Sequence, residues 1–298
     1  MKYLLPALLL SAFFAAVSPG ALADATPADI PHADSPAAAT APLAWRAEHV
    51  VFPTDSPSAV HLVTRLVFRN ATDAPLPLPP AILHSADSAA ETCPFDPPSR
   101  LDPVPPRGEL VLVLLDEPAM PAEIRTVYDG VRFDRFPRSP RTDWHYGTGF
   151  SPLVTTRLTL RNTSAVTLPP GPLRLIRFDA KRNPAPVGEA ALPLLRRRGS
   201  ATLDLGPADN LLGTRRRLAC NEVIPGTVFE ETFAVTLENR TGSDTVVRVL
   251  EHLYRGGVPS ISASDFPYAA DGPGTIRFDV PVKAGASKTV TYTAHYIW

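Results

Sequence analysis

The sequence predicts an all-β protein, and three observations lead to that prediction. Apolar residues alternate with polar ones over several stretches, a period that places successive side chains on opposite faces of a strand. The 298 residues include 35 prolines, against about 5% in average proteins, and proline breaks helix interiors. Beyond the first twenty residues, no apolar stretch with a helical period runs without a Pro or Gly. We therefore expect two sandwich-like antiparallel β domains in tandem, after a signal peptide and a disordered linker.

Residues 1–23 have the features of a secretory signal peptide. Lys2 provides the positive start, residues 4–17 the apolar core, and Ala21-Leu22-Ala23 the small-residue cleavage site. A membrane anchor is the alternative, but the core is too short and Pro6 interrupts it. No later segment is long and apolar enough to cross a bilayer. The sequence therefore predicts an exported protein, located in the periplasm or at the cell surface or secreted.

Residues 24–42 are rich in Ala, Pro, Asp and Thr, and we expect a disordered linker there. An N-terminal β domain is predicted over residues 43–140. Its first clear strand covers residues 60–68, and an apolar run at 108–115 is expected to be a strand buried on both faces. Residues 122–133 are predicted to form a strand pair with a tight turn at Asp129-Gly130.

A domain boundary is expected at residues 137–152, because prolines and charges collect there before Gly147-Thr148-Gly149. The C-terminal β domain should cover residues 150–298. Shorter strands are predicted at residues 154–160, 173–178 and 201–205. Four strands should close this domain, at residues 229–237, 245–254, 276–282 and 290–298. The inward side chains of the last strand are predicted to be Val290, Tyr292, Ala294, Tyr296 and Trp298.

Three strands share an ending. Asn70, Asn162 and Asn239 each close a strand and are followed by a short polar turn with Thr or Ser. Asn tolerates the left-handed conformation and bonds its own backbone, so strand ends favour it. The alternative is N-glycosylation, because each site has the pattern N-x-[ST]. We expect the turn role.

The second half of the chain resembles the C-terminal domain of the mucoidy-inhibitor-like bacterial family, a domain of unknown function. The matching segments are TRLTLRN at residues 156–162, LPPGPLRL at 168–175, VGEAALP at 187–193, ATLDLG at 201–206, the strand that ends at residues 237–239, IRFDVPV at 276–282 and VTYTAHYIW at 290–298. The coiled coil that often accompanies this domain is missing here. The resemblance implies a β fold and a cell-envelope setting, and it implies no reaction.

Cys93 and Cys220 are the two cysteines of the chain. An even number in an oxidising compartment favours a disulfide, so a Cys93–Cys220 bridge is predicted; two separate buried thiols are the alternative. The net charge of −1 gives no general attraction to nucleic acid. No metal-ligand spacing, phosphate loop or nucleophile motif occurs, so no cofactor, metal or catalytic residue is predicted.

Candidate binding residues fall in two groups. The first is Asp143-Trp144-His145-Tyr146 at the domain junction, a cluster suited to general-base chemistry by His145 or to stacking of a sugar on the aromatic rings. Aromatic packing between domains is the alternative. The second group comprises two arginine runs that could gather on neighbouring loops around an anionic ligand: Arg196, Arg197 and Arg198, and Arg215, Arg216 and Arg217. Solvated loop clusters are the alternative here.

Glu251-His252 lies in a predicted strand, where adjacent residues face opposite ways. We expect a solvated His beside a Glu at the edge of the core. Taken together, the sequence predicts a non-catalytic binding or assembly module of a bacterial cell envelope, with an envelope protein or an anionic polysaccharide as its partner. The alternative is a glycan-active hydrolase with carboxylates on loops, because such pairs cannot be read from a sequence. The oligomeric state is not indicated.

Overall fold

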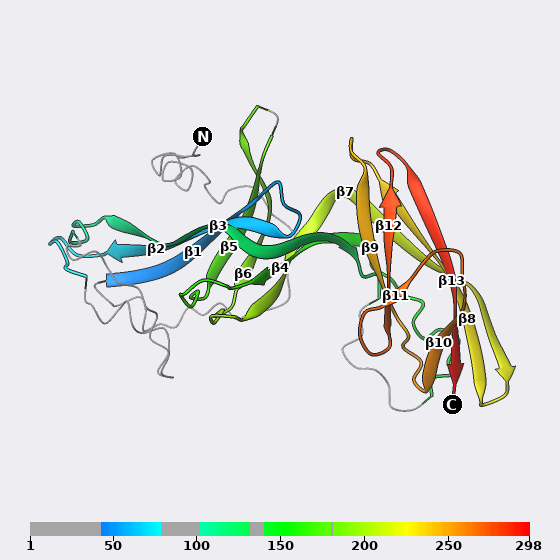
Figure 1. The fold of residues 1–298 in the computed structure, drawn as a ribbon. Helices are drawn as coiled ribbons and strands as arrows, with labels where there is room; N and C mark the ends of the chain where they lie inside the picture. The colour runs from blue at the N-terminus through cyan, green and yellow to red at the C-terminus, as the bar shows by residue number, and fades with distance from the viewer. Residues whose placement is uncertain (1–42, 79–101, 132–139, 180) are drawn as a thin grey trace. The chain divides into compact units, whose positions relative to one another are not determined.

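The computed structural model describes residues 43–78, 102–131, 140–179 and 181–298. No helix occurs among these residues, and the strands belong to one mixed, hydrogen-bonded system (Figure 1). The all-β prediction is therefore confirmed. The strands are β1 (Leu43–Pro53), β2 (Ala59–Asn70), β3 (Glu109–Tyr128), β4 (Leu153–Arg161), β5 (Gly171–Phe178), β6 (Pro184–Leu192), β7 (Ser200–Ile224), β8 (Val228–Asn239), β9 (Thr245–His252), β10 (Val258–Ser264), β11 (Ala269–Ala270), β12 (Thr275–Val282) and β13 (Ser287–Ile297).

Two long strands, β3 and β7, each change partner along their length, and the end of β3 also pairs with β9 (Figure 1). The first half of β3 pairs with β2 and the second half with β4; β7 pairs first with β4 and then with β8. Both strands contain prolines, which remove ladder donors. Pro118 and Pro207 lie where the pairing register shifts, the positions at which a strand tolerates proline. Gly206, which precedes Pro207 at the register shift in β7, has a φ of 99°.

The three asparagines form one repeated structure. In each copy the Nδ2 group donates to two backbone carbonyls and the Oδ1 atom accepts from the Thr or Ser two residues later. Asn239 Nδ2 lies 2.9 Å from the Ser243 carbonyl oxygen and 3.1 Å from that of Val282, while Oδ1 accepts from Thr241 N at 2.9 Å. Asn70 and Asn162 make the equivalent bonds. All three side chains are almost completely buried. The predicted turn role is confirmed, and the amide nitrogens that glycosylation would need are not exposed.

Each asparagine is also bonded to the residue that lies just before a later partner strand. The backbone N–H of Asn70 donates to Gly108 O, that of Asn162 to Gly199 O, and that of Asn239 to Ala286 O. The strands that follow those acceptors, β3, β7 and β13, pair antiparallel with β2, β4 and β8 respectively. We refer to the three copies as asparagine brackets. Each bracket joins a strand end, a turn and the start of the following partner strand.

The buried apolar side chains form three clusters. The largest lies among β7, β8, β9, β12 and β13, the second among β1 to β7, and a small one joins Ala47, Leu66, Phe68 and Val104. The alternation predicted for the closing strands is confirmed: Val290, Tyr292, Ala294 and Tyr296 are at most 1% exposed. Trp298 is half-buried against the largest cluster.

Several predictions differ from the structure. Residues 109–115 alternate between exposed and half-buried instead of being buried on both faces. Residues 122–128 continue the same strand and pair with β4 and, at their end, with β9, while Gly130 O accepts from Ser151 N at 2.7 Å. Residues 132–133, in the second half of the predicted strand pair, lie outside the described residues. Strand pairing also crosses the predicted boundary, since β1 pairs with β5 and β3 with β4. The tandem of two sandwich-like domains stays a prediction.

The predicted signal peptide, the linker and Cys93 lie outside the described residues. Cys220 is a buried free thiol, and no disulfide occurs in the described part of the chain, so the predicted Cys93–Cys220 bridge is not supported. The Cys220 sulfur lies instead 3.8 Å from a carboxylate oxygen of Glu231 and 4.0 Å from a guanidinium nitrogen of Arg255. Burial and the Glu231 charge raise the pKa of this thiol, which disfavours the reactive thiolate.

Candidate functional site

The predicted cluster Asp143–Tyr146 lies in a loop, residues 141–147, between β3 and β4. We refer to it as the junction loop. The Asp143 carboxylate accepts a hydrogen bond from His145 N at 3.0 Å, and Tyr146 N donates to Asp143 O at 3.2 Å. Asp143, Trp144 and His145 are exposed, whereas Tyr146 is half-buried. The loop is therefore a closed turn that presents one aromatic ring and one imidazole to solvent.

Two buried arginines hold the carbonyl groups of this loop. Arg255 donates to the carbonyl oxygens of Arg141 and Asp143, the latter at 3.0 Å, and lies 3.5 Å from that of Tyr146. Arg215 donates to Gly147 O at 2.7 Å. In return, Arg141 N donates to Arg255 O at 3.0 Å. The loop thus has bonds along its length to groups inside the fold, which restricts its conformations.

Two buried glutamates balance the arginine charges. The Nη2 and Nε atoms of Arg255 each lie 2.7 Å from an oxygen of Glu231, and Arg215 Nε lies 2.8 Å from Glu251. Burial opposes the charge of both guanidinium groups, but the neighbouring carboxylates outweigh it and raise the pKa of Arg215 and Arg255. Both guanidinium groups are therefore charged within the core.

Aromatic rings complete the cluster. The Arg215 guanidinium lies 3.6 Å from the centroid of Phe233 and that of Arg255 lies 4.4 Å from Phe229, distances of cation–π contacts. Tyr254 donates to Glu231 at 3.0 Å, and Tyr292 donates to Glu251. Burial and the Glu251 charge raise the pKa of Tyr292 well above its ordinary value, so its hydroxyl is a donor at physiological pH.

The two buried glutamates and the exposed Trp144 have different roles. Glu231 and Glu251 are 0% and 2% exposed, and both are bonded by an arginine and a tyrosine, so they stabilise the interior. Trp144 is 54% exposed, with its ring edge-on to Phe229 at 6.3 Å between centroids. The opposite side of the indole is available to a partner. This arrangement suits recognition by a pre-organised aromatic side chain.

The structure does not bring the two arginine runs together on neighbouring loops. Arg196, Arg197 and Arg198 are exposed in the turn before β7, where Arg198 has a φ of 61° and its N–H donates to Asn162 O at 2.7 Å. Arg215, Arg216 and Arg217 instead lie inside β7, in a regular stretch of pairing with β8. Because side chains alternate along a strand, Arg215 points inward to the junction loop and Arg216 is exposed. The interpretation of this run as a loop was wrong.

His252 is not solvated as expected. Its Nε2 atom lies 2.9 Å from Asp129 Oδ1 and its Nδ1 atom 3.1 Å from Thr275 Oγ1. Arg157 donates to the other oxygen of Asp129 at 3.0 Å. Burial opposes the charge of Asp129, yet the bonds from His252 and Arg157 lower its pKa. This group connects the end of β3 to β9 and β12.

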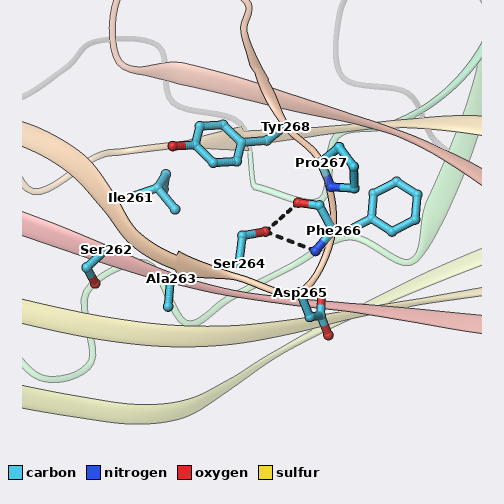
Figure 2. A pocket seen from close by; sticks show the side chains of 8 residues that line it. All are labelled: Ile261, Ser262, Ala263, Ser264, Asp265, Phe266, Pro267 and Tyr268. Atoms are coloured by element: carbon cyan, nitrogen blue, oxygen red, sulfur yellow. Dashed lines mark hydrogen bonds between the residues drawn. The ribbon is translucent and has the colours of Figure 1, made fainter.

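A second surface feature was not predicted. Residues 261–268, from within β10 to the residue before β11, line an open hollow of about 580 Å³ (Figure 2). The Ser264 hydroxyl donates to Phe266 O at 2.6 Å and accepts from Phe266 N at 3.2 Å. No pattern of these residues marks them in the sequence, because Val258–Ser264 consists mainly of small side chains without an apolar alternation.

No group of three His, Cys, Asp or Glu side chains suited to a metal occurs within the described ranges. Among the same residues, no helix is long and apolar enough to span a membrane. No protein-family model matches the chain, and no curated protein matches it significantly. The resemblance to the mucoidy-inhibitor-like family therefore stays a prediction from the sequence.

Proposed function

We propose that the protein is an exported, non-catalytic binding or assembly module of a bacterial cell envelope, built from sandwich-like β domains, with the junction loop as its contact surface. The observation that carries the proposal is the exposed pair Trp144 and His145 on a loop whose carbonyls are held by Arg215 and Arg255. A contact surface ordered before binding loses less conformational entropy when the partner arrives.

The compartment rests on the predicted signal peptide and on the family resemblance. The partner is an envelope protein or an anionic polysaccharide. An aromatic side chain that is half exposed and supported from behind is the kind of residue that anchors interfaces. The exposed arginines at 196–198 supply a cationic surface, which favours anionic partners and makes the association sensitive to salt. This second contact is distinct from the junction loop.

The test is crosslinking in the native envelope, followed by affinity capture with the wild-type protein and with variants. Trp144→Ala and His145→Ala should reduce capture of a discrete partner, whereas Phe178→Ala, which removes a ring of similar exposure on β5 (52% against 54%), should not. Replacing Arg196, Arg197 and Arg198 with serine should weaken capture of an anionic partner and flatten its salt dependence.

A parallel screen against cell-wall and polysaccharide substrates distinguishes the hydrolase. Multiple-turnover hydrolysis that a single carboxylate replacement abolishes would overturn the binding proposal. If Trp144→Ala, His145→Ala and the wild-type protein capture the partner equally well, the junction loop is not the contact surface.

A further inference from the structure

We propose that the hollow at residues 261–268 binds an uncharged saccharide unit, at a site separate from the junction loop. The hollow has a volume within the range of small-ligand sites, and its lining includes an aromatic ring, serine hydroxyls and one carboxylate. Sugars present C–H groups on one face and hydroxyls around the ring, so this combination of side chains matches their chemistry.

The bend that forms the hollow is fixed by short-range and long-range bonds. Asp265 N donates to Thr291 O at 3.0 Å, and Thr291 N donates to Asp265 Oδ1 at 2.7 Å, which ties the bend to β13. Ser264 closes the turn onto Phe266 (Figure 2). Phe266 in turn packs against the largest apolar cluster. The hollow therefore keeps its form without a ligand.

Tyr268 supplies the stacking surface. Its ring packs against Phe278, with 6.2 Å between centroids, and 47% of the residue is exposed. One side of the ring is thus supported by the core while the other remains open. Aromatic residues held in this way offer contact area at little cost in conformational entropy.

Charge decides against an anionic ligand. No Lys or Arg lines the hollow, and Asp265 adds a negative charge. A phosphate or an acidic polysaccharide would therefore be repelled, whereas carboxylate and serine groups can bond to neutral hydroxyls. This ligand differs from the anionic partner expected for the arginines at 196–198.

An extended peptide is also disfavoured. β10 pairs only with β13 in the described structure, so one of its edges is open. However, Pro259 lies in the strand and the register shifts between Ile261 and Ala263. Proline and a bulge are the features that prevent an edge strand from accepting another strand. The bulge lies among the residues that line the hollow, and pairing with β13 continues to Ser264 before the chain bends.

The experiment is titration of the full exported chain with soluble neutral oligosaccharides, namely maltohexaose, cellotetraose, a mannose trisaccharide and the tetramer of N-acetylglucosamine, followed by NMR and calorimetry. At least one should bind and shift resonances of residues 261–268. Tyr268→Ala should weaken that binding about tenfold, the upper range of an aromatic contact, and Tyr268→Phe should retain most of it.

Phe178→Ala serves as the matched control, because it removes an exposed ring on β5, outside both proposed sites, and should leave saccharide binding unchanged. Absence of binding by the whole panel would overturn the inference, as would saccharide binding that Tyr268→Ala leaves intact or that Phe178→Ala also loses. Loss of saccharide binding in Trp144→Ala, with binding by Tyr268→Ala intact, would assign the saccharide to the junction loop. That result also overturns a site at residues 261–268. Failure of partner capture at the junction loop has no bearing on these results.

Discussion

Replacing Asn239 with alanine should cost a large part of the stability of the protein. The side chain is 0% exposed and takes part in four hydrogen bonds. They run from Nδ2 to Ser243 O and Val282 O, and to Oδ1 from Thr241 N and Thr241 Oγ1. Alanine removes all four and leaves the surrounding polar groups without these partners.

The magnitude follows from the burial of each partner. The bond to Val282 O is buried, and a buried group left unsatisfied costs about 1–3 kcal/mol. The three part-buried bonds contribute about 0.5–1.5 kcal/mol each. Added together, these terms give an expected loss of about 2.5–7.5 kcal/mol, against a total of about 5–15 kcal/mol for a typical domain.

The assay is urea denaturation followed by circular dichroism, comparing the free energies of unfolding of wild type and variants. Asn239→Asp keeps the shape of the side chain but cannot donate to two carbonyls, so it should be destabilised at neutral pH at least as much as the alanine variant. Asn221→Ala is the control, because Asn221 is exposed on β7, and it should change stability by less than about 0.5 kcal/mol. An Asn239→Asp variant as stable as wild type would refute the reasoning, because donation by the amide would then be unimportant.

Three further predictions concern the interior. His49 is 1% exposed and bonded to Thr64 and to Pro169 O, and burial lowers its pKa from 6.5 to about 4. The imidazole is neutral in the folded protein, whereas in the unfolded chain it takes up a proton below pH 6.5. Its contribution to the free energy of unfolding is therefore complete above pH 6.5 and falls by about 3 kcal/mol towards pH 4. Denaturation at several pH values should show a smaller loss of stability on acidification in His49→Gln than in wild type. Arg215→Met should destabilise the protein by about 3–5 kcal/mol, because it leaves Glu251 buried without its charge partner. The double variant Arg215→Met with Glu251→Leu should recover much of that loss. A double variant no more stable than the single one would argue against a role for the ion pair. Deletion of residues 290–298 removes the inward side chains of β13, worth up to about 8 kcal/mol, and a deleted protein with an unchanged melting temperature would contradict their role in the core.

The elements that sequence reasoning identified are those with a clear alternation. In β8, β12 and β13 the buried residues alternate along the strand and, apart from Glu231 and Asn239, they are apolar, so the period alone defines the inward face. The turn of each asparagine bracket was also predictable, because Asn followed by Thr or Ser at a strand end has a local physical reason, whereas the bond from each asparagine to the start of a distant partner strand was not. β10 escaped notice because small residues carry no periodic signal.

The two parts of β3 were predicted as separate strands, and only the start of β7 was predicted as a strand. Pro118, Gly206 and Pro207 resemble breaks in these strands. They are bulges instead, and whether a proline ends a strand or occupies a bulge depends on a partner strand that the sequence does not identify. Glu231 did carry a usable signal. A glutamate at an inward position of an otherwise apolar strand requires a buried partner.

That partner, Arg255, lies 24 residues further along the chain, and no local pattern connects the two. The junction loop was selected for its aromatic and charged residues, but its attachment to Arg215 and Arg255 depends on long-range packing. The predicted arginine cluster failed for a related reason. A run of three arginines was interpreted as a solvated loop, whereas in a strand the middle residue and its neighbours face opposite ways.

The most direct test of the central claim is photocrosslinking from inside the native envelope, with a benzoylphenylalanine introduced at position 144 and, as control, at position 178. The two positions have similar exposure, so they sample the surroundings equally. If the junction loop is the contact surface, position 144 should give a discrete adduct that position 178 does not give, and the adduct should persist in a protein that also carries Tyr268→Ala. Discrete adducts at position 178 only, identical products from both positions, or no adduct from position 144 would contradict the account.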